Sequence, residues 1–136
     1  MENFYFICYK SLFNLEMTLK YNVIGFGRTA TIPKDKRVVM LYRKDKEWYV
    51  VGDCYFGEET EDNPFEEPEK YPITYSIKDV RTCKPVPINA VLRKQAGQYW
   101  GLLLQHSMEI KDPVILDYVN NNFDSEVQIL DILRNM

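Results

Sequence analysis

The residues that most readily do chemistry in proteins are sparse in this sequence. Cys8, Cys54 and Cys83 are widely spaced, and no two of them have the Cys-x-x-Cys spacing of a zinc or redox site. His106 is the only histidine, so a zinc site would lack ligands. Each cysteine lies in an apolar strand pattern, which predicts a small buried side chain rather than a thiol nucleophile. We therefore expect no metal site and no cofactor.

Carboxylates are concentrated in residues 58–70, and they suggest acid–base chemistry at first sight. That segment also contains Pro64 and Pro68, and a proline-containing loop does not hold two carboxyl groups in a rigid frame. The run Gly25-Phe26-Gly27-Arg28 lacks the strand–Gly-x-Gly-x-x-Gly–helix order of a dinucleotide site. These patterns favour a protein that is not an enzyme. The glutamates concerned are Glu58, Glu59, Glu66, Glu67 and Glu69.

Charge is segregated along the chain, although the formal net charge is only −3. Residues 1–50 carry nine Lys/Arg against five Asp/Glu, whereas residues 51–75 carry eight acids and one lysine. A mildly acidic protein with a basic half can bind a polyanion locally, but it does not coat nucleic acid as a histone does. Solvated faces without any ligand are an equally good explanation of the charge alone.

The length of 136 residues, 46% of them apolar, predicts one folded domain. No apolar run approaches the roughly twenty residues of a membrane-spanning helix. Met1-Glu2-Asn3 lacks the basic end of a secretory signal, and Lys10 soon interrupts the first apolar run. The sequence therefore predicts a cytoplasmic location.

The elements expected to position any site are strands interrupted by short helices. Residues 3–9 predict a central strand, and Ser11 is expected to cap a helix over residues 12–20. Residues 37–44 and 47–57 form a predicted hairpin, and an exposed loop follows over residues 58–70. A further strand is expected from Pro72 to Cys83, ended by Pro85 and Pro87.

The last third of the chain predicts mainly helices. These cover residues 88–94, a segment that begins at Asp112, and residues 124–136 with Ser125 as the cap. The whole pattern predicts an α+β fold, a mixed and partly closed β-barrel of five to six strands with three to four short helices. Residues 1–123 form the expected domain, and the helix in residues 124–136 is expected to pack on it or to form a homodimer contact.

Five segments, in order, resemble the EVE domain, a family of small nucleic-acid-binding barrels in the PUA-like and YTH-like group. The resemblance covers most of the chain. The segments are Phe6-Ile7-Cys8 with Ser11 and Asn14, Asn22 to Gly27, Ile32 to Val39, Lys70-Tyr71-Pro72-Ile73, and Tyr99 to Met108. The last segment follows Gln98 and begins Tyr99-Trp100-Gly101. They are similar to the family's opening strand and turn, its Asn-x-Trp-Gly loop, its Ile-x-x-Gly-Asp strand entry, its Tyr-Pro-x-Arg strand and its closing Trp-x-Gly-x-Leu segment.

The resemblance implies a pocket for a flipped or modified base, in which polar groups meet the base edge and aromatic faces stack on the ring. The pocket would lie between the first helix, the Gly25 loop and the Tyr99–Gly101 segment. The residues that would bind the base are Ser11, Asn14, Asn22, Ile24, Gly25, Phe26, Tyr99, Trp100 and Gly101. Those that would contact phosphates beside it are Arg28, Lys34, Lys36 and Arg37.

The sequence departs from the family at two positions of the implied pocket. Ile24 stands where the family usually has Trp, and Leu15 stands where many members have a second Trp. The leading hypothesis is a module that binds RNA or DNA through one base. The alternatives are an interaction or scaffold protein with a degenerate pocket, and an amidohydrolase of the related ASCH group, for which Glu16, Thr18 and Lys20 are the available residues.

Overall fold

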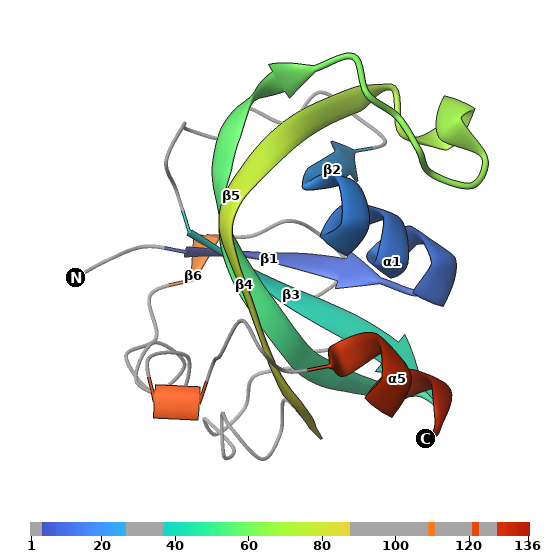
Figure 1. Ribbon diagram of the computed structural model, residues 1–136, viewed down its shortest axis with the longest axis vertical. Coiled ribbons are helices and arrows are strands. Elements are labelled where there is room, and N and C mark those ends of the chain that lie inside the picture. The colour runs from blue at the N-terminus through green and yellow to red at the C-terminus, as the bar shows by residue number, and fades with distance from the viewer. Residues whose placement is uncertain (1–3, 27–36, 88–108, 111–120, 123–127) are drawn as a thin grey trace.

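Two long antiparallel strands form the middle of one curved sheet (Figure 1). The structure is a computed structural model, and it describes residues 4–26, 37–87, 109–110, 121–122 and 128–136. The elements follow in the order β1 (Phe4–Tyr9), α1 (Leu12–Tyr21), β2 (Val23–Phe26), β3 (Arg37–Lys44), β4 (Glu47–Thr60), the 3-10 turn η1 (Pro68–Lys70), β5 (Ile73–Pro87), β6 (Glu109–Ile110) and α5 (Ile129–Arg134).

The sheet is mixed, which confirms the predicted α+β class. Its strand order is β2-β5-β4-β3-β1-β6, in which β1 runs parallel to β3 and the other neighbours are antiparallel. Among the described strands, β2 and β6 form the two edges and do not pair with each other. The sheet is thus open, and the expected partly closed barrel is not formed by this part of the chain.

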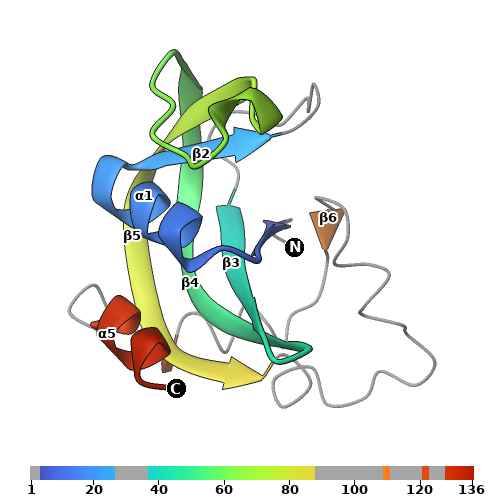
Figure 2. The ribbon, with the colours of Figure 1, turned by 90° about the vertical axis from the view of Figure 1, so that its right-hand side faces the viewer.

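Irregular pairing accounts for the strong curvature of β4 and β5. Their register shifts at three places, between Val50 and Gly52, between Asp53 and Tyr55, and between Phe56 and Glu59. A bulge of this kind bends a strand and increases its twist. The two long strands therefore wrap around one side of the molecule, and α1 lies inside the curve (Figures 1 and 2).

Helix α1 begins as its sequence predicts. The Ser11 hydroxyl accepts a hydrogen bond from the backbone N–H of Asn14 at 3.2 Å, which is the geometry of an N-cap. The helix ends at Asn22, whose φ of 54° places it in the left-handed region that Asn and Gly tolerate best. The Asn22 carbonyl then accepts the backbone N–H of Ile77 at 2.9 Å, which ties the end of α1 to β5.

The core lies between the concave face of the sheet and the two helices. It contains side chains from every described strand except β6 and from α1 and α5. Its buried members are Ile7, Tyr9, Leu15, Ile24, Phe26, Val38, Met40, Val51, Cys54, Phe56, Ile77, Ile129 and Leu133. Because α1 and α5 cover the same face, they hold the curved sheet from the inside.

The C-terminal helix packs on the domain, which was one of the two expected arrangements. Ile129 and Leu133 of α5 are buried, and the Lys44 ammonium donates hydrogen bonds to the carbonyls of Leu133 and Met136. Arg134 also pairs with Glu16 of α1 at 2.9 Å. The helix begins at Ile129, later than expected, and the proposed cap Ser125 lies outside the described residues. A homodimer contact through this helix stays a prediction.

Two expected strand ends are shifted in the structure. Strand β4 continues through Thr60, so residues 58–60 belong to the sheet rather than to the loop. Strand β5 continues through Pro85 to Pro87. Proline is tolerated there because β2 pairs with β5 only over residues 73–76, which leaves the far end of β5 as an edge strand.

The remaining helix predictions, over residues 88–94 and from Asp112 onward, lie outside the described residues, except that Asn121 and Asn122 are helical. Of the helices in the described part of the chain, none has the length and apolar character to cross a membrane.

Candidate functional site

Asn14 joins α1 to the loop that follows β4. Its side-chain Oδ1 accepts the backbone N–H of Glu66 at 2.9 Å, and its Nδ2 donates to the Tyr71 hydroxyl at 3.3 Å. The residue is 6% exposed. A buried amide with both ends hydrogen-bonded is stable only while its partners stay in place, so Asn14 fixes this loop against the helix.

Phe65 and Tyr71 lie next to each other in this loop, and both pack against Gly25 of β2. Their ring centroids are 5.4 Å apart with an interplanar angle of 54°. A Cβ at position 25 would lie 2.8 Å from the Phe65 ring and 2.9 Å from the Tyr71 Cβ, so only glycine permits this approach. Asn14, Gly25, Phe65 and Tyr71 are called the Asn14 cluster below.

Asn63 holds the ends of the same loop together. Its Nδ2 donates to the carbonyls of Pro68 and Tyr71, at 3.1 and 2.8 Å. Its Oδ1 is the one buried side-chain oxygen or nitrogen in the described residues without a hydrogen-bond partner. The loop therefore contains an amide oxygen that can still accept a hydrogen bond, close in sequence to the two aromatic rings.

Ser11 and Asn22, the two polar residues expected beside Asn14, lie at the two ends of α1 as its N-cap and C-cap. The Ser11 hydroxyl is engaged as the N-cap of α1. Asn22 ends the same helix, eight residues beyond Asn14, which separates the two by about 12 Å along the helix axis. Its side chain is exposed. Asn22 thus lies about two helical turns from Asn14, and base contacts by Ser11 and Asn22 stay predictions.

Ile24 and Phe26 flank Gly25 and belong to the core. Ile24 is fully buried, and Phe26 forms an aromatic group with Phe56 and Tyr75 at centroid distances of 5.9 and 6.0 Å. Residues on either side of Gly25 point to the face opposite Gly25 in an extended strand. Direct contacts of these two side chains with a base stay predictions.

The other expected base-binding residues, Tyr99, Trp100 and Gly101, lie outside the described residues, as do Arg28, Lys34 and Lys36 of the expected phosphate contacts. Their roles stay predictions.

Arg37, the fourth expected phosphate contact, is 4% exposed and pairs with an acid inside the protein. Its Nε donates to Asp53 Oδ2 at 2.8 Å, and Arg81 donates to both oxygens of the same carboxylate, at 3.0 and 2.7 Å. The hydrogen bond to Asp53 raises the pKa of Arg81. Arg37 also lies over the Tyr55 ring, 5.8 Å from its centroid. A phosphate would have to compete with Asp53 for Arg37.

The three residues available for amidohydrolase chemistry do not meet. The Thr18 hydroxyl is buried and shares a hydrogen bond of 2.6 Å with the Tyr9 hydroxyl. Glu16 pairs with Arg134, and Lys20 lies over the Tyr21 ring at 5.3 Å. Each side chain is engaged with a different neighbour, so the structure does not bring these three residues together.

The cysteines behave as small apolar residues, as their sequence context predicts. All three are free thiols, and Cys54 and Cys83 are buried. Burial raises the pKa of Cys8 and of Cys83 to about 12, and it also raises the pKa of Cys54. Reactive thiolates are therefore not expected near neutral pH. In the described part of the chain, no three His, Cys, Asp or Glu side chains are grouped as metal ligands.

The sequence-based prediction of the site did not include the two aromatic residues of the Asn14 cluster. Phe65 is the only aromatic residue in the acidic segment, a signal that it is buried while its neighbours are solvated. Tyr71 belongs to one of the five segments that resemble the EVE domain, but its side chain was not assigned to a site. Their approach to Asn14 depends on the path of the loop, which the sequence pattern does not show.

Comparison with solved structures identifies the fold. The YTH domain of Pho92, solved in complex with m6A, matches with a TM-score of 0.61 and 11% identity, over 92% of this chain and 89% of that one. The YTH domain of the Zygosaccharomyces rouxii MRB1 protein, solved in complex with N6-methyladenosine RNA, matches with a TM-score of 0.57 and 12% identity, over 88% and 85% of the chains.

The chain therefore has a YTH-like fold, which lies within the wider group that the sequence resembles. No protein-family model and no curated protein matches the sequence. Membership of the EVE family stays a prediction.

Proposed function

We propose that this chain is a non-enzymatic nucleic-acid-binding module that recognises an extruded or modified base at the Asn14 cluster. The observation that carries the proposal is a buried amide, Asn14, that hydrogen-bonds to Tyr71, one of two aromatic residues that pack together against Gly25. The fold adds support, because both solved relatives are YTH domains bound to N6-methyladenosine or to RNA that contains it.

The Asn14 amide offers the chemistry that a base edge requires. Its Oδ1 accepts and its Nδ2 donates, so it can form two neighbouring hydrogen bonds with an adenine edge. In the structure, these two groups are occupied by the Glu66 backbone N–H and the Tyr71 hydroxyl. A base that binds Asn14 would replace both partners, so binding requires the loop to move away from α1.

The aromatic rings supply the stacking faces. Phe65 is 5% exposed because it packs against Gly25, and Tyr71 is half-buried beside it. A base inserted between these rings and β2 would replace the packing of the rings against Gly25 with stacking of the rings on the base. Stacking on an aromatic side chain contributes about 1–3 kcal/mol per base. Tyr99 or Trp100 would provide a further face, as the resemblance implies.

Electrostatics makes the binding weak and dependent on salt. The loop next to the Asn14 cluster is acidic and repels phosphates, so the phosphate contacts of a bound strand would have to come from Arg28, Lys34 and Lys36, as the resemblance implies. Each neutralised phosphate contributes a slope of about −0.7 to −0.9 in log K against log salt concentration. These three cations allow a total slope of roughly −2 to −3.

The direct test compares RNA and DNA oligonucleotides of about nine nucleotides with and without one N6-methyladenosine, by fluorescence anisotropy at low salt. We expect the methylated RNA to bind more tightly. Tyr71→Ala should reduce this preference about fivefold or more, since it removes a stacking face. Tyr71→Phe keeps the ring and frees the Asn14 amide, so it should preserve the preference.

The matched control is Tyr21→Ala, because Tyr21 is an exposed tyrosine on α1 that is not one of the four residues of the cluster. Arg28→Ala with Lys36→Ala should flatten the salt dependence and leave the preference for the modified base unchanged. If the parent protein binds none of the oligonucleotides, or if Tyr71→Ala and Tyr21→Ala act alike, the proposal is wrong.

An interaction or scaffold protein is the second candidate. The hydrogen bonds that hold the loop closed over Asn14, together with Ile24 and Leu15 in place of tryptophans, favour it. Failure of all oligonucleotides to bind at low salt is the result that this candidate predicts.

A further inference from the structure

The outward face of α1 is apolar where a surface helix is normally polar. Phe13 is 46% exposed and Tyr21 is 53% exposed, and Met17 lies midway between them and is partly exposed. The three residues follow at intervals of four, so they line one side of the helix. Leu15 and Thr18, on the opposite side, face the core. Phe13, Met17 and Tyr21 are called the α1 stripe below.

This stripe is not a scatter of single surface residues. Three large hydrophobic side chains are exposed in the described part of the chain, and two of them, Phe13 and Tyr21, belong to the α1 stripe. The third, Met136, is at the C-terminus. An amphipathic helix that buries one apolar face ordinarily presents charged residues on the other. A second apolar face therefore suggests a second contact surface.

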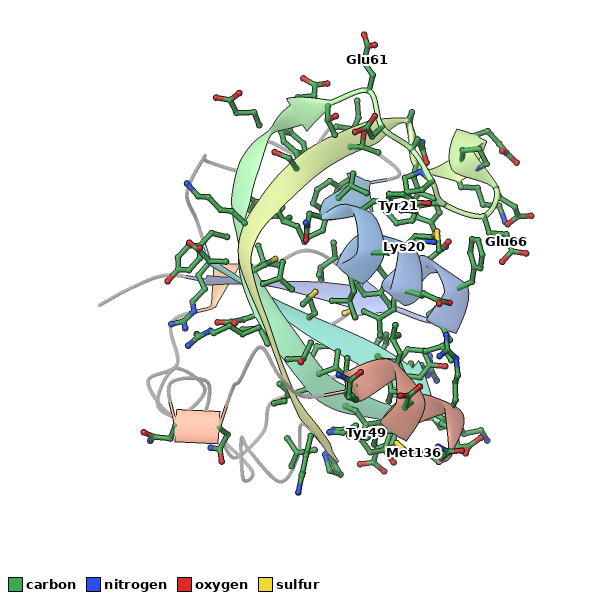
Figure 3. All side chains as sticks on the ribbon, in the orientation of Figure 1. Lys20, Tyr21, Tyr49, Glu61, Glu66 and Met136 are labelled. Carbon is green, nitrogen blue, oxygen red and sulfur yellow. The ribbon has the colours of Figure 1, made fainter. Side chains whose placement is uncertain are left out.

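An acidic loop adjoins the α1 stripe at Glu66. The acidic loop, residues 61–70, carries five carboxylates and only one cation, Lys70, and all six side chains are exposed. The loop lies directly beside the stripe, because the Glu66 backbone N–H binds the side chain of Asn14, the neighbour of Phe13. Figure 3 shows Lys20 and Tyr21 on α1 and Glu66 on the adjoining loop. The carboxylates are Glu61, Asp62, Glu66, Glu67 and Glu69.

We propose that the α1 stripe and the acidic loop together form a docking surface for a protein segment that is amphipathic and basic. Apolar side chains of the segment would cover Phe13, Met17 and Tyr21. Its lysines or arginines would face the carboxylates of the loop. This pairing of a central apolar contact with complementary charge at the rim is the usual construction of a specific interface.

The charge of the acidic loop selects a protein over a nucleic acid as the occupant. Exposed aromatic rings can stack on bases, but the loop has a net charge of −4, from five acids and one lysine. Such a loop repels the phosphates of any strand laid along α1. The one cation of the helix face, Lys20, lies over the Tyr21 ring at 5.3 Å. It is six positions from Asn14, which places it about 120° around the helix from the loop side.

The test measures binding of the full chain to a synthetic helical peptide of about 18 residues, with leucines along one face and lysines on the other. We expect this peptide to bind and the same peptide with glutamates in place of the lysines not to bind. Phe13→Ala with Tyr21→Ala should raise the Kd about tenfold, because it removes the centre of the interface. Glu66→Gln with Glu69→Gln should raise it about threefold at low salt and have little effect at high salt.

Matched controls distinguish binding at the proposed surface from nonspecific hydrophobic or ionic binding of the peptide. Met136→Ala removes a hydrophobic side chain that is 46% exposed, the same fraction as Phe13, and should not change the Kd. Asp45→Asn removes an exposed acid in the β3–β4 turn and should likewise have no effect. All these positions are exposed, so the variants should fold, and circular dichroism checks this.

Three results would overturn the proposal. The first is equal binding of the lysine and glutamate peptides, and the second is an unchanged Kd for Phe13→Ala with Tyr21→Ala. The third is that no peptide binds, while the protein self-associates in sedimentation velocity and Phe13→Ala with Tyr21→Ala abolishes this self-association. The occupant of the surface would then be a second copy of the chain. The test is independent of base recognition, since neither Phe13 nor Tyr21 belongs to the Asn14 cluster.

Discussion

The two charged regions of this molecule are constructed in opposite ways. Between β3, β4 and β5, the Asp53 side chain is 1% exposed and binds Arg37 and Arg81 at 2.8 and 2.7 Å. The acidic loop keeps its carboxylates in solvent, and its Lys70–Glu67 ion pair joins side chains that are 62% and 56% exposed. One region uses charge to hold strands together, whereas the other presents charge at the surface.

The difference shows why a count of charges along the chain is a poor guide to the surface. Arg37 contributes to the basic balance of residues 1–50, yet its side chain is buried and its charge is matched by Asp53. The acids of residues 61–70 are exposed, so the negative charge counted for them in the sequence does appear at the protein surface. Water screens the exposed charges, but the buried ones interact in a medium of lower dielectric constant and lost their hydration on folding.

The largest expected effect comes from Asp53→Ala, which removes the ion pair that the buried Arg37 makes with Asp53. Removal of one partner of a buried ion pair typically costs about 3–5 kcal/mol. Arg81 is partly exposed and can turn to water, so most of this loss would arise at Arg37. Urea unfolding measures the change in the free energy of unfolding.

The control for Asp53 is Asp131→Asn, which breaks an exposed pair with Arg134 and should change the free energy of unfolding by less than about 0.5 kcal/mol. Equal effects of the two substitutions would remove the distinction between the two kinds of region.

The next largest effect is expected where the acidic loop is attached to the core. Asn14→Leu deprives the Glu66 N–H and the Tyr71 hydroxyl of their partner in a nearly buried place. We expect a loss of about 1–3 kcal/mol and faster amide hydrogen exchange at Glu66. This result would show that the charged side chains of the loop are exposed, whereas the neutral side chain of Asn14 anchors the loop to α1.

The control is Asn135→Leu, because the Asn135 amide makes an exposed hydrogen bond to the Asp131 carbonyl that water can replace. Unchanged exchange at Glu66 in the Asn14 variant would mean that contacts other than the Asn14 amide hold the loop.

The smallest effect is expected for Lys70→Gln, which removes the exposed pair with Glu67. That pair raises the pKa of Lys70, but both side chains are in solvent, where such pairs contribute little to stability. The midpoint of urea unfolding should not change measurably. A shift comparable to that of Asp53→Ala would contradict the view that the loop's charges serve the surface rather than the fold.

Several elements followed from the sequence because their causes are local. Ser11 caps α1 through its own hydroxyl, and the apolar pattern of residues 4–9 forms β1. The alternation from Ile73 to Ile77 likewise forms the core face of β5. Periodicity and capping involve residues within a few positions of each other, so a single sequence displays them.

The candidate site was only half visible in the sequence. Asn14 and Gly25 stood in segments that resemble a known family, and the structure brings them together. Phe65 and Tyr71 reach the same place because the acidic loop folds back over α1, through contacts between residues 40 to 57 positions apart in the chain. No local pattern encodes the path of such a loop.

By itself, the sequence determined the class of the fold, most of its strands, the start of α1 and the burial of its thiols. The tertiary structure alone decided that the sheet formed by the described strands stays open, that Arg37 is paired inside the protein, and that an apolar stripe remains on the outer face of α1. The physical reason is that helix caps and strand patterns arise from neighbouring residues. Burial of a charge, closure of a sheet and exposure of a helix face depend on which distant elements pack together.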